Sequence, residues 1–178
     1  MLKKILFVVA ALLAVTAVVV AMQPDTYRVV RSATINAPPE DVFGMVNDFH
    51  KWEAWSPWGK LDPGMKVAYS GAPSGTGAVY DWTGNKDVGK GRMSITDSRP
   101  NEQIRIRLEF IEPFPSEADN EFTFTPGSGS TKVDWAMAGN HNFLSKTMCL
   151  FTGGMDKMIG PDFEKGLAQL KAAVEVAK

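Results

Sequence analysis

The feature that most constrains this chain is an alternation of apolar and polar or charged residues that recurs between positions 78 and 137. Successive side chains of a strand point to opposite faces of a sheet, so this alternation gathers the apolar side chains on one face. A sheet with one solvent-exposed face and one apolar face is typically antiparallel. The apolar rows are Ala78, Tyr80 and Trp82; Ile104, Ile106, Leu108 and Phe110; Ala118, Phe122 and Phe124; and Val133, Trp135 and Met137.

Turn residues separate these runs. The segments 71–77 and 84–87 have the glycines of hairpin connections, and the clusters 98–101 and 126–129 contain the Pro, Gly, Ser and Asn of tight turns. A further strand is predicted before them, because residues 27–36 alternate and are rich in β-branched side chains. Between that strand and the others, the prolines and acidic residues after Ala37 indicate a short helix that ends near Asp48.

The apolar face of such a sheet must be covered, and the C-terminus offers a helix for this purpose. Apolar residues recur there at spacings of four, three and four, in Phe163, Leu167, Leu170 and Val174. Pro161 suits the first position of a helix, so we expect this helix to begin at Gly160-Pro161. The preceding segment 143–159 is apolar and partly helical by its pattern, but its glycines weaken it and predict a mobile lip.

The N-terminus has a different character. Lys3 and Lys4 precede an uncharged apolar run at residues 5–22, long enough as a helix to cross the hydrocarbon core of a membrane. The positive-inside rule keeps the N-terminus in the cytoplasm and exports the chain beyond this run. An uncleaved anchor is favoured over two alternatives, a signal peptide cleaved after Val19-Val20-Ala21 and a cytosolic apolar tail. The predicted organisation is thus an anchor or signal segment at 1–22, a linker at 23–26 and one domain at 27–178.

Composition excludes several classes of protein. A chain of 178 residues with 22% charged side chains is large and apolar enough to form a core without disulfides or a structural metal. Without residues 1–22, which contain Lys3 and Lys4, 19 − 2 = 17 basic side chains face 20 acidic ones. That balance argues against a nucleic-acid partner. Cys149 is the only cysteine, and its apolar neighbours predict a buried, inert thiol.

Several segments resemble bacterial members of the START/Bet v 1-like (SRPBCC) superfamily, in its polyketide cyclase/dehydrase-like branch. The similar segments are 47–58, Tyr69-Ser70-Gly71, 75–82, 131–135 and 160–171, and the likeness covers nearly the whole chain after Tyr27. It implies an α+β helix-grip fold, in which two short helices follow the first strand and a curved seven-stranded antiparallel sheet wraps around the long C-terminal helix. A cavity between sheet and helix is expected, and similar bacterial proteins also have an N-terminal membrane segment.

Aromatic and apolar side chains on the predicted inner surfaces are the candidate site. Trp52, Trp55 and Trp58 are unusually dense for a loop, and they either plug one end of the barrel as core or form the wall and entrance of an apolar ligand site. The same choice between core and cavity lining applies to the strand and helix residues. The tentative ligand-binding set is Trp52, Trp55, Trp58, Tyr80, Trp82, Phe110, Asn120, Phe122, Trp135, Met137, Phe163 and Leu167.

Polar candidates are few. Asn120 interrupts an inward row, so its amide needs a buried partner, which we expect to be a backbone group, a water or a ligand. Near the tryptophans, Asp48, His50 and Glu53 are the groups that a cyclase or isomerase could use as a general base, although no residue is assigned as catalytic. No cofactor or metal is predicted, because His50 and His141 stand far apart. Residues 84–91 approach a phosphate-binding loop but place Gly91 where Ser or Thr is required, so a hairpin is predicted there.

The favoured function is binding of an apolar or amphipathic, lipid-like small molecule beneath the C-terminal helix. A cyclase or hydratase using the same pocket is the enzymatic alternative, and a co-chaperone-like protein-interaction module is the third. The expected partners are a hydrophobic ligand and the membrane, and protein partners stay open. We expect a bacterial inner-membrane protein with its domain on the periplasmic side, or a periplasmic protein if the signal is cleaved.

Overall fold

The computed structural model describes residues 1–176, so the last two residues of the predicted 27–178 domain lie outside it. An N-terminal helix, α1 (Leu2–Ala21), is followed by strand β1 (Thr26–Ile35), helix α2 (Pro39–Val46) and two 3₁₀ helices, η1 (Phe49–Ala54) and η2 (Trp58–Lys60). Six strands come next, and two helices end the chain. These elements are β2 (Lys66–Gly71), β3 (Ala78–Thr83), β4 (Lys90–Arg99), β5 (Gln103–Glu112), β6 (Ser116–Gly127), β7 (Ser130–Asn140), α3 (Phe143–Thr152) and α4 (Met155–Val176).

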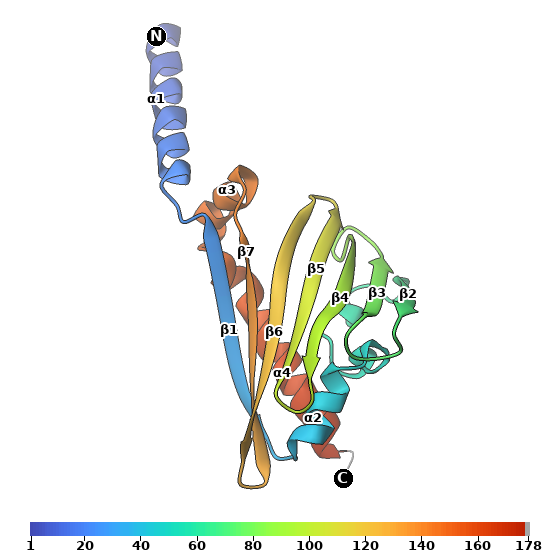
Figure 1. Cartoon of the computed structure of the whole chain (residues 1–178). Helices are drawn as coiled ribbons and strands as arrows, with labels where there is room; N and C mark the ends of the chain where they lie inside the picture. Colours follow the sequence, from blue (N-terminus) through green and yellow to red (C-terminus); the bar gives the residue numbers. More distant parts are fainter. Residues whose placement is uncertain (177–178) are drawn as a thin grey trace.

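The seven strands form one antiparallel sheet in the order β1-β7-β6-β5-β4-β3-β2. Every neighbouring pair except β1 and β7 is consecutive in the chain, so short connections between successive strands build most of the sheet. The sheet curves around α4, which packs closely against β1 (Figure 1). The predicted α+β helix-grip arrangement is confirmed.

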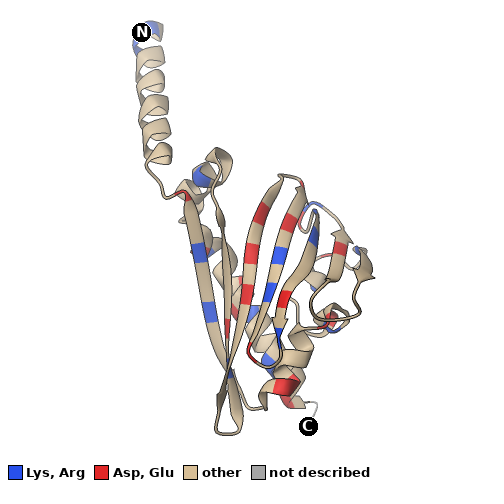
Figure 2. Cartoon of the chain, viewed as in Figure 1, with Lys and Arg blue, Asp and Glu red and all other residues tan. Residues whose placement is uncertain are grey.

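The two faces of the sheet have the predicted characters. The inner face buries Ile104, Ile106 and Leu108 of β5 together with the matching rows of β6 and β7 and with Ala78 and Trp82 of β3. Phe110 at the end of that β5 row is 37% exposed, more open than the alternation predicts. On the outer face, basic and acidic residues of neighbouring strands alternate (Figure 2). Arg107 is 3.1 Å from both Glu117 and Asp119, and Arg105 is 3.3 Å from Glu121.

The C-terminal helix begins earlier than predicted. It starts at Met155, five residues before Gly160, and Pro161 lies inside it. Proline inside a helix lacks the N–H that would bond to the carbonyl four residues back, so an interruption was expected there. The guanidinium of Arg31 joins the two halves of α4, because it binds Asp156 at 2.7 Å before the proline and Glu164 at 2.6 Å after it. A tertiary contact therefore stabilises a helix that the local sequence disfavours.

The segment predicted as a mobile lip contains a regular helix. Asn142 and Ser145 form a reciprocal capping box at the start of α3, and Gly153 ends the helix in the left-handed conformation that glycine favours. The side chain of Lys146, only 8% exposed, reaches back to the linker after α1 and binds the carbonyl oxygen of Gln23 at 3.0 Å and the carboxylate of Asp25 at 2.6 Å. These bonds fix α3 at the base of α1 (Figure 1).

The N-terminal helix stands apart from the remainder of the chain (Figure 1). It is long and apolar enough to cross a membrane, and its side chains are exposed except near its end, where Val20 is buried. Basic side chains occur on α1 only at its N-terminal end (Figure 2).

Candidate ligand-binding site

The predicted ligand-binding residues come together, but they contact one another. Trp135 of β7 stacks on Phe163 of α4 with ring centroids 4.0 Å apart, and on Phe122 of β6 at 4.8 Å. Trp55 meets Trp135 edge-on at 5.8 Å. Edge-to-face and offset arrangements of this kind are the favourable ones for aromatic rings. This part of the predicted set therefore forms packed core.

The same network continues toward the far edge of the sheet. Trp52 contacts Phe49, Phe49 contacts Tyr80, and Tyr80 contacts Trp82, with centroid distances of 5.2, 5.8 and 6.2 Å. Trp82 then reaches Phe110 at 6.0 Å. Met137 and Leu167 are buried in the same cluster, while Trp58 and Tyr80 are partly buried against it. The rings thus make a continuous aromatic path from α4 to β3.

The buried amide of Asn120 has a partner that the sequence did not suggest. Its Oδ1 accepts a hydrogen bond of 3.2 Å from the indole Nε1 of Trp135, another residue of the predicted set. We expected a backbone group, a water or a ligand in this place. The protein instead satisfies two inward polar groups with each other, as buried polar atoms require.

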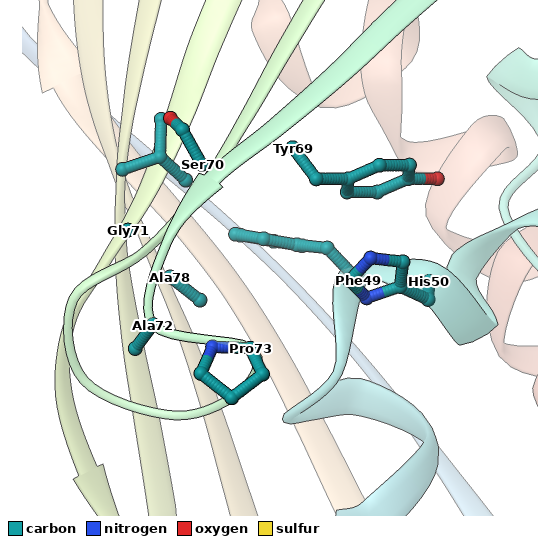
Figure 3. Close-up of a pocket in the computed structure, with 9 residues that line it drawn as sticks. Phe49, His50, Tyr69, Ser70, Gly71, Ala72, Pro73 and Ala78 are labelled. Atoms are coloured by element: carbon teal, nitrogen blue, oxygen red, sulfur yellow. The ribbon is translucent and has the colours of Figure 1, made fainter.

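A pocket of about 280 Å³ lies between η1 and the hairpin of β2 and β3 (Figure 3). Most of its lining is apolar, and its polar residues are His50, Tyr69 and Ser70. The lining residues are Phe49, His50, Tyr69, Ser70, Gly71, Ala72, Pro73, Ala78 and Val79. Ligand sites commonly range from roughly 300 to 1,000 Å³, so this pocket suits a small molecule or one end of a longer one.

None of the twelve predicted residues lines this pocket. Phe49 nevertheless connects the pocket to the aromatic interior that those residues form. Its ring belongs both to the pocket wall and to the aromatic path through Trp52 and Tyr80. The alternation of the strands could not reveal this site, because η1 and the β2–β3 turn are irregular. The available signal was the aromatic density after Asp48 and the Tyr69-Ser70-Gly71 segment, which the sequence shows 20 residues further on.

His50 is the most reactive group at the pocket. Its ring stacks on that of Tyr69 with centroids 4.0 Å apart (Figure 3). Its Nδ1 lies 2.9 Å from Oδ1 of Asp48. The same carboxylate oxygen accepts a bond of 2.9 Å from the His50 backbone N–H and so caps η1. Asp48 therefore orients the imidazole and leaves Nε2 as the ring nitrogen that can meet a bound molecule.

The neighbouring tyrosines are held in their neutral form. Burial raises the pKa of Tyr80 to about 12, and the nearby Tyr69 and the carboxylate of Glu53 act in the same direction. Burial also raises the pKa of Tyr69, with Glu53 and Asp48 contributing. At neutral pH, both phenols are therefore hydrogen-bond donors and not anions.

Three further features concern binding. A second hollow of about 380 Å³ lies beside β1, β6 and β7 and is lined by Thr26, Tyr27, Arg28, Asp119, Ala138, Gly139 and Asn140. Within residues 1–176, no three His, Cys, Asp or Glu side chains gather where they could hold a metal ion. Residues 84–89 of the segment that approaches a phosphate loop form the predicted connection between β3 and β4, and Lys90 and Gly91 belong to β4.

Solved structures share this architecture. Protein CV1439 from Chromobacterium violaceum superposes with a TM-score of 0.56 at 20% identity, covering 85% of this chain and 99% of that one. Ara h 8.0201 gives 0.56 at 12% identity, with 85% and 97% covered. The di-domain ARO/CYC StfQ from the steffimycin biosynthetic pathway gives 0.62 at 11% identity, with 86% of this chain and 52% of that chain covered. At these identities the likeness establishes the fold alone.

Sequence comparison identifies the family. No curated protein matches the sequence significantly. The profile of the family described as "Polyketide cyclase / dehydrase and lipid transport" matches residues 26–175, which is most of the chain and nearly all of it after α1. The sheet, the C-terminal helix and the connections between them fall within that match. The chain therefore belongs to the polyketide cyclase/dehydrase and lipid transport family.

Proposed function

We propose that this protein is a membrane-tethered carrier that binds an apolar or amphipathic small molecule at the pocket of Phe49, His50 and Tyr69. The main supporting observation is the position of Phe49, which joins an apolar pocket to the aromatic interior. Burial of apolar ligand surface there contributes about 25 cal/mol per Å². His50 and the neutral phenol of Tyr69 orient a polar end of the ligand. Family membership supports a hydrophobic ligand.

The pocket can enlarge from its outer side. All six residues of β2 are exposed, and this edge strand pairs only with β3. Displacement of β2 would expose little buried surface, and segments with little burial open at low cost in free energy. The β2–β3 connection would keep its bonds from the Gly75 N–H to the carbonyl oxygen of Asn47 and from the Gly77 N–H to that of Ile95. A longer ligand would then extend past Phe49 toward Trp52 and Tyr80, members of the tentative binding set. In this proposal the interior aromatic side chains pack against one another in the free protein and move apart when a ligand enters.

In the proposed organisation, residues 1–22 are the membrane anchor, 23–26 the linker and 27–178 the binding domain. The length and apolar character of α1 support a single span, and the two lysines support a cytoplasmic N-terminus. The binding domain would then lie on the periplasmic side. The mass of the chain in a purified membrane fraction tests this, because cleavage after Ala21 would remove α1 and release the domain.

Native mass spectrometry of the full chain in phosphatidylcholine nanodiscs tests the carrier proposal. The wild type should carry a co-purifying apolar molecule or take up a fluorescent fatty acid added to the nanodiscs. Ala72→Trp, which fills the pocket, should reduce that uptake by about tenfold or more, as expected for a blocked apolar site. Ala68→Trp places the same ring on exposed β2 outside the pocket and serves as the control. Equal uptake by both variants would refute the proposed site.

A second candidate function rests on the Asp48–His50 pair. An imidazole held at 2.9 Å by a carboxylate beside an apolar pocket has the geometry of a general base for a cyclase or dehydrase reaction. His50→Gln and Asp48→Asn should then remove turnover of a polyketide-like substrate even at ligand concentrations that saturate uptake. Uptake without turnover in the wild type would leave the carrier role alone.

The protein-interaction alternative is less well supported. The basic side chains on the outer face of the sheet, Arg105 and Arg107 of β5, are already paired with carboxylates of β6. A protein partner would have to replace those ion pairs.

A further inference from the structure

Helix α3 combines a fixed inner side with an apolar outer side. Lys146 and Cys149 face inward and are buried. Five large apolar side chains are exposed, including Phe143 at 67% and Phe151 at 79%. At 3.6 residues per turn these five span an arc of roughly 160° on one side of the helix. The exposed apolar residues are Phe143, Leu144, Met148, Leu150 and Phe151.

No charged side chain lies on this exposed side. Lys146 is the only charged residue of α3, and its ammonium is bound to Gln23 and Asp25 on the inner side. The hydroxyl of Thr147, the one polar residue within the apolar arc, donates to the carbonyl oxygen of Phe143 at 2.8 Å. The outer side of α3 therefore offers an apolar surface with its hydrogen-bonding needs met internally. Surfaces of this kind mark contact sites for apolar partners.

The position of α3 indicates which partner covers it. A helix of 20 residues rises about 30 Å, the thickness of the hydrocarbon core, so a spanning α1 places Ala21 at the membrane boundary. Only residues 22–25 separate α1 from β1, so β1 begins within about 18 Å of that boundary. The bonds from Lys146 to Gln23 and Asp25 hold α3 within the same short interval.

A further exposed apolar group lies at the same end of the molecule. The connection between β5 and β6 is at the end of the sheet from which α1 emerges (Figure 1), and its Phe114 is exposed. Apolar side chains at this end thus come from α3 and from a sheet connection that is distant in sequence. A flat apolar partner could contact both.

We propose that α3 lies in the interfacial layer of the same membrane that α1 crosses, with Phe143 and Phe151 inserted among the lipid chains. This proposal rests on the membrane span proposed for α1. The absence of free basic side chains on α3 means that insertion depends on apolar burial and not on anionic lipid. The contact fixes the orientation of the binding domain relative to the membrane.

Electron paramagnetic resonance on the full chain in phosphatidylcholine nanodiscs tests this proposal. A nitroxide is attached to a cysteine introduced by Phe143→Cys or Phe151→Cys, and its collision rates with oxygen and with a water-soluble nickel complex are compared. The wild-type chain, whose only thiol is the buried Cys149, measures background labelling. Lys86→Cys on the exposed β3–β4 connection is the aqueous control, and Leu12→Cys in α1 is the lipid control.

Labels at 143 and 151 should show the high oxygen-to-nickel ratio of the Leu12 label, and raising NaCl to about 0.5 M should leave it unchanged. A ratio equal to that at Lys86 would overturn the proposal. If the Leu12 label is also accessible to the nickel complex, the proposed membrane span of α1 is refuted as well. If the Leu12 label is in lipid and the α3 labels are in water, only the α3 contact is refuted. Dipolar broadening between α3 labels would assign this surface to a second copy and also overturn the proposal.

Discussion

The indole ring of Trp82 covers Gly91, its register partner on β4, and leaves no space for a side chain there. A Cβ on Gly91 would overlap two ring carbons of Trp82 and lie 2.5 Å from the carbonyl oxygen of Glu109. The indole Nε1 also donates to the carbonyl of Val88 at 3.0 Å, which fixes the ring over the glycine. Glycine in a strand commonly marks such a close approach. The residue that excluded a phosphate loop is thus required by the sheet.

Gly91→Ala should therefore destabilise the fold. Overpacking of a filled site costs about 1–3 kcal/mol, and the rigid ring and backbone here allow little relief. Thermal or urea unfolding of the full chain in detergent measures the change. Gly59→Ala is the matched control, because a Cβ there meets nothing within 4 Å. Equal stability of the two variants would show that Trp82 can move away from β4.

The buried pair of Asn120 and Trp135 makes a second prediction. Asn120→Ala leaves the indole N–H of Trp135 buried without its acceptor, so it should lower the free energy of unfolding by about 1–3 kcal/mol. In the Trp135→Phe background the same substitution should cost less, because no donor remains to be orphaned. A double-mutant cycle measures this coupling. Additive effects would mean that the hydrogen bond does not contribute to stability.

Gly160 and Arg31 make a third prediction. A Cβ at Gly160 would overlap Nη2 of Arg31 and lie 2.7 Å from its Cζ, so Gly160→Ala should push the guanidinium away from Asp156 and Glu164. The expected decrease in Tm is about 2–4 °C or less, because the guanidinium ends a flexible side chain and ion pairs with exposed carboxylates contribute little to stability. In the Arg31→Ala background the substitution should be neutral or slightly stabilising, because alanine favours a helix more than glycine does. A decrease of the same size in that background would contradict the role of Arg31.

A fourth prediction concerns pH. Burial lowers the pKa of His141, and the nearby Lys146 ammonium adds to that effect. The histidine of the unfolded chain has a pKa of about 6.5. As the pH falls, it therefore takes up its proton at a higher pH than His141 does in the folded chain. The contribution of His141 to stability is therefore complete above about pH 6.5 and is lost as the pH falls through the lower folded pKa.

The Tm of the wild type should accordingly decrease between about pH 7.5 and pH 5.5, and His141→Gln should reduce that decrease. Carboxylates with lowered pKa values, such as Asp25 beside Lys146, titrate below this interval and do not obscure it. An unchanged pH dependence in His141→Gln would assign the effect to another group.

Much of the fold could be predicted because its elements have local patterns. Ile104, Ile106 and Leu108 alternate with charged residues, and that period alone assigns them to the inner face. The start of α4 could not be predicted in this way. Gly160 and Pro161 disfavour a continuous helix locally, and Arg31, 133 residues away from Glu164, binds both halves.

The candidate site was predicted less well than the fold. The alternation identified which aromatic residues face inward, and Trp135, Phe122 and Phe163 do so. The alternation could not distinguish core residues from residues that line a cavity. That difference depends on whether rings from different elements fill the space between the sheet and the helices. The pocket instead uses Tyr69 and His50, which adopt their stacked arrangement only when the β2–β3 hairpin meets η1.

The sequence by itself determined the local preferences of this protein: an apolar N-terminal helix, strands with one apolar face, and a terminal helix to cover that face. These preferences come from periodicity, turn residues and charge, which act over a few neighbouring positions. The tertiary structure decided how the inner rings fill the sheet, where a pocket remains, and that the apolar side of α3 stays uncovered beside α1. Those outcomes depend on contacts between residues far apart in the chain, and no local pattern contains them.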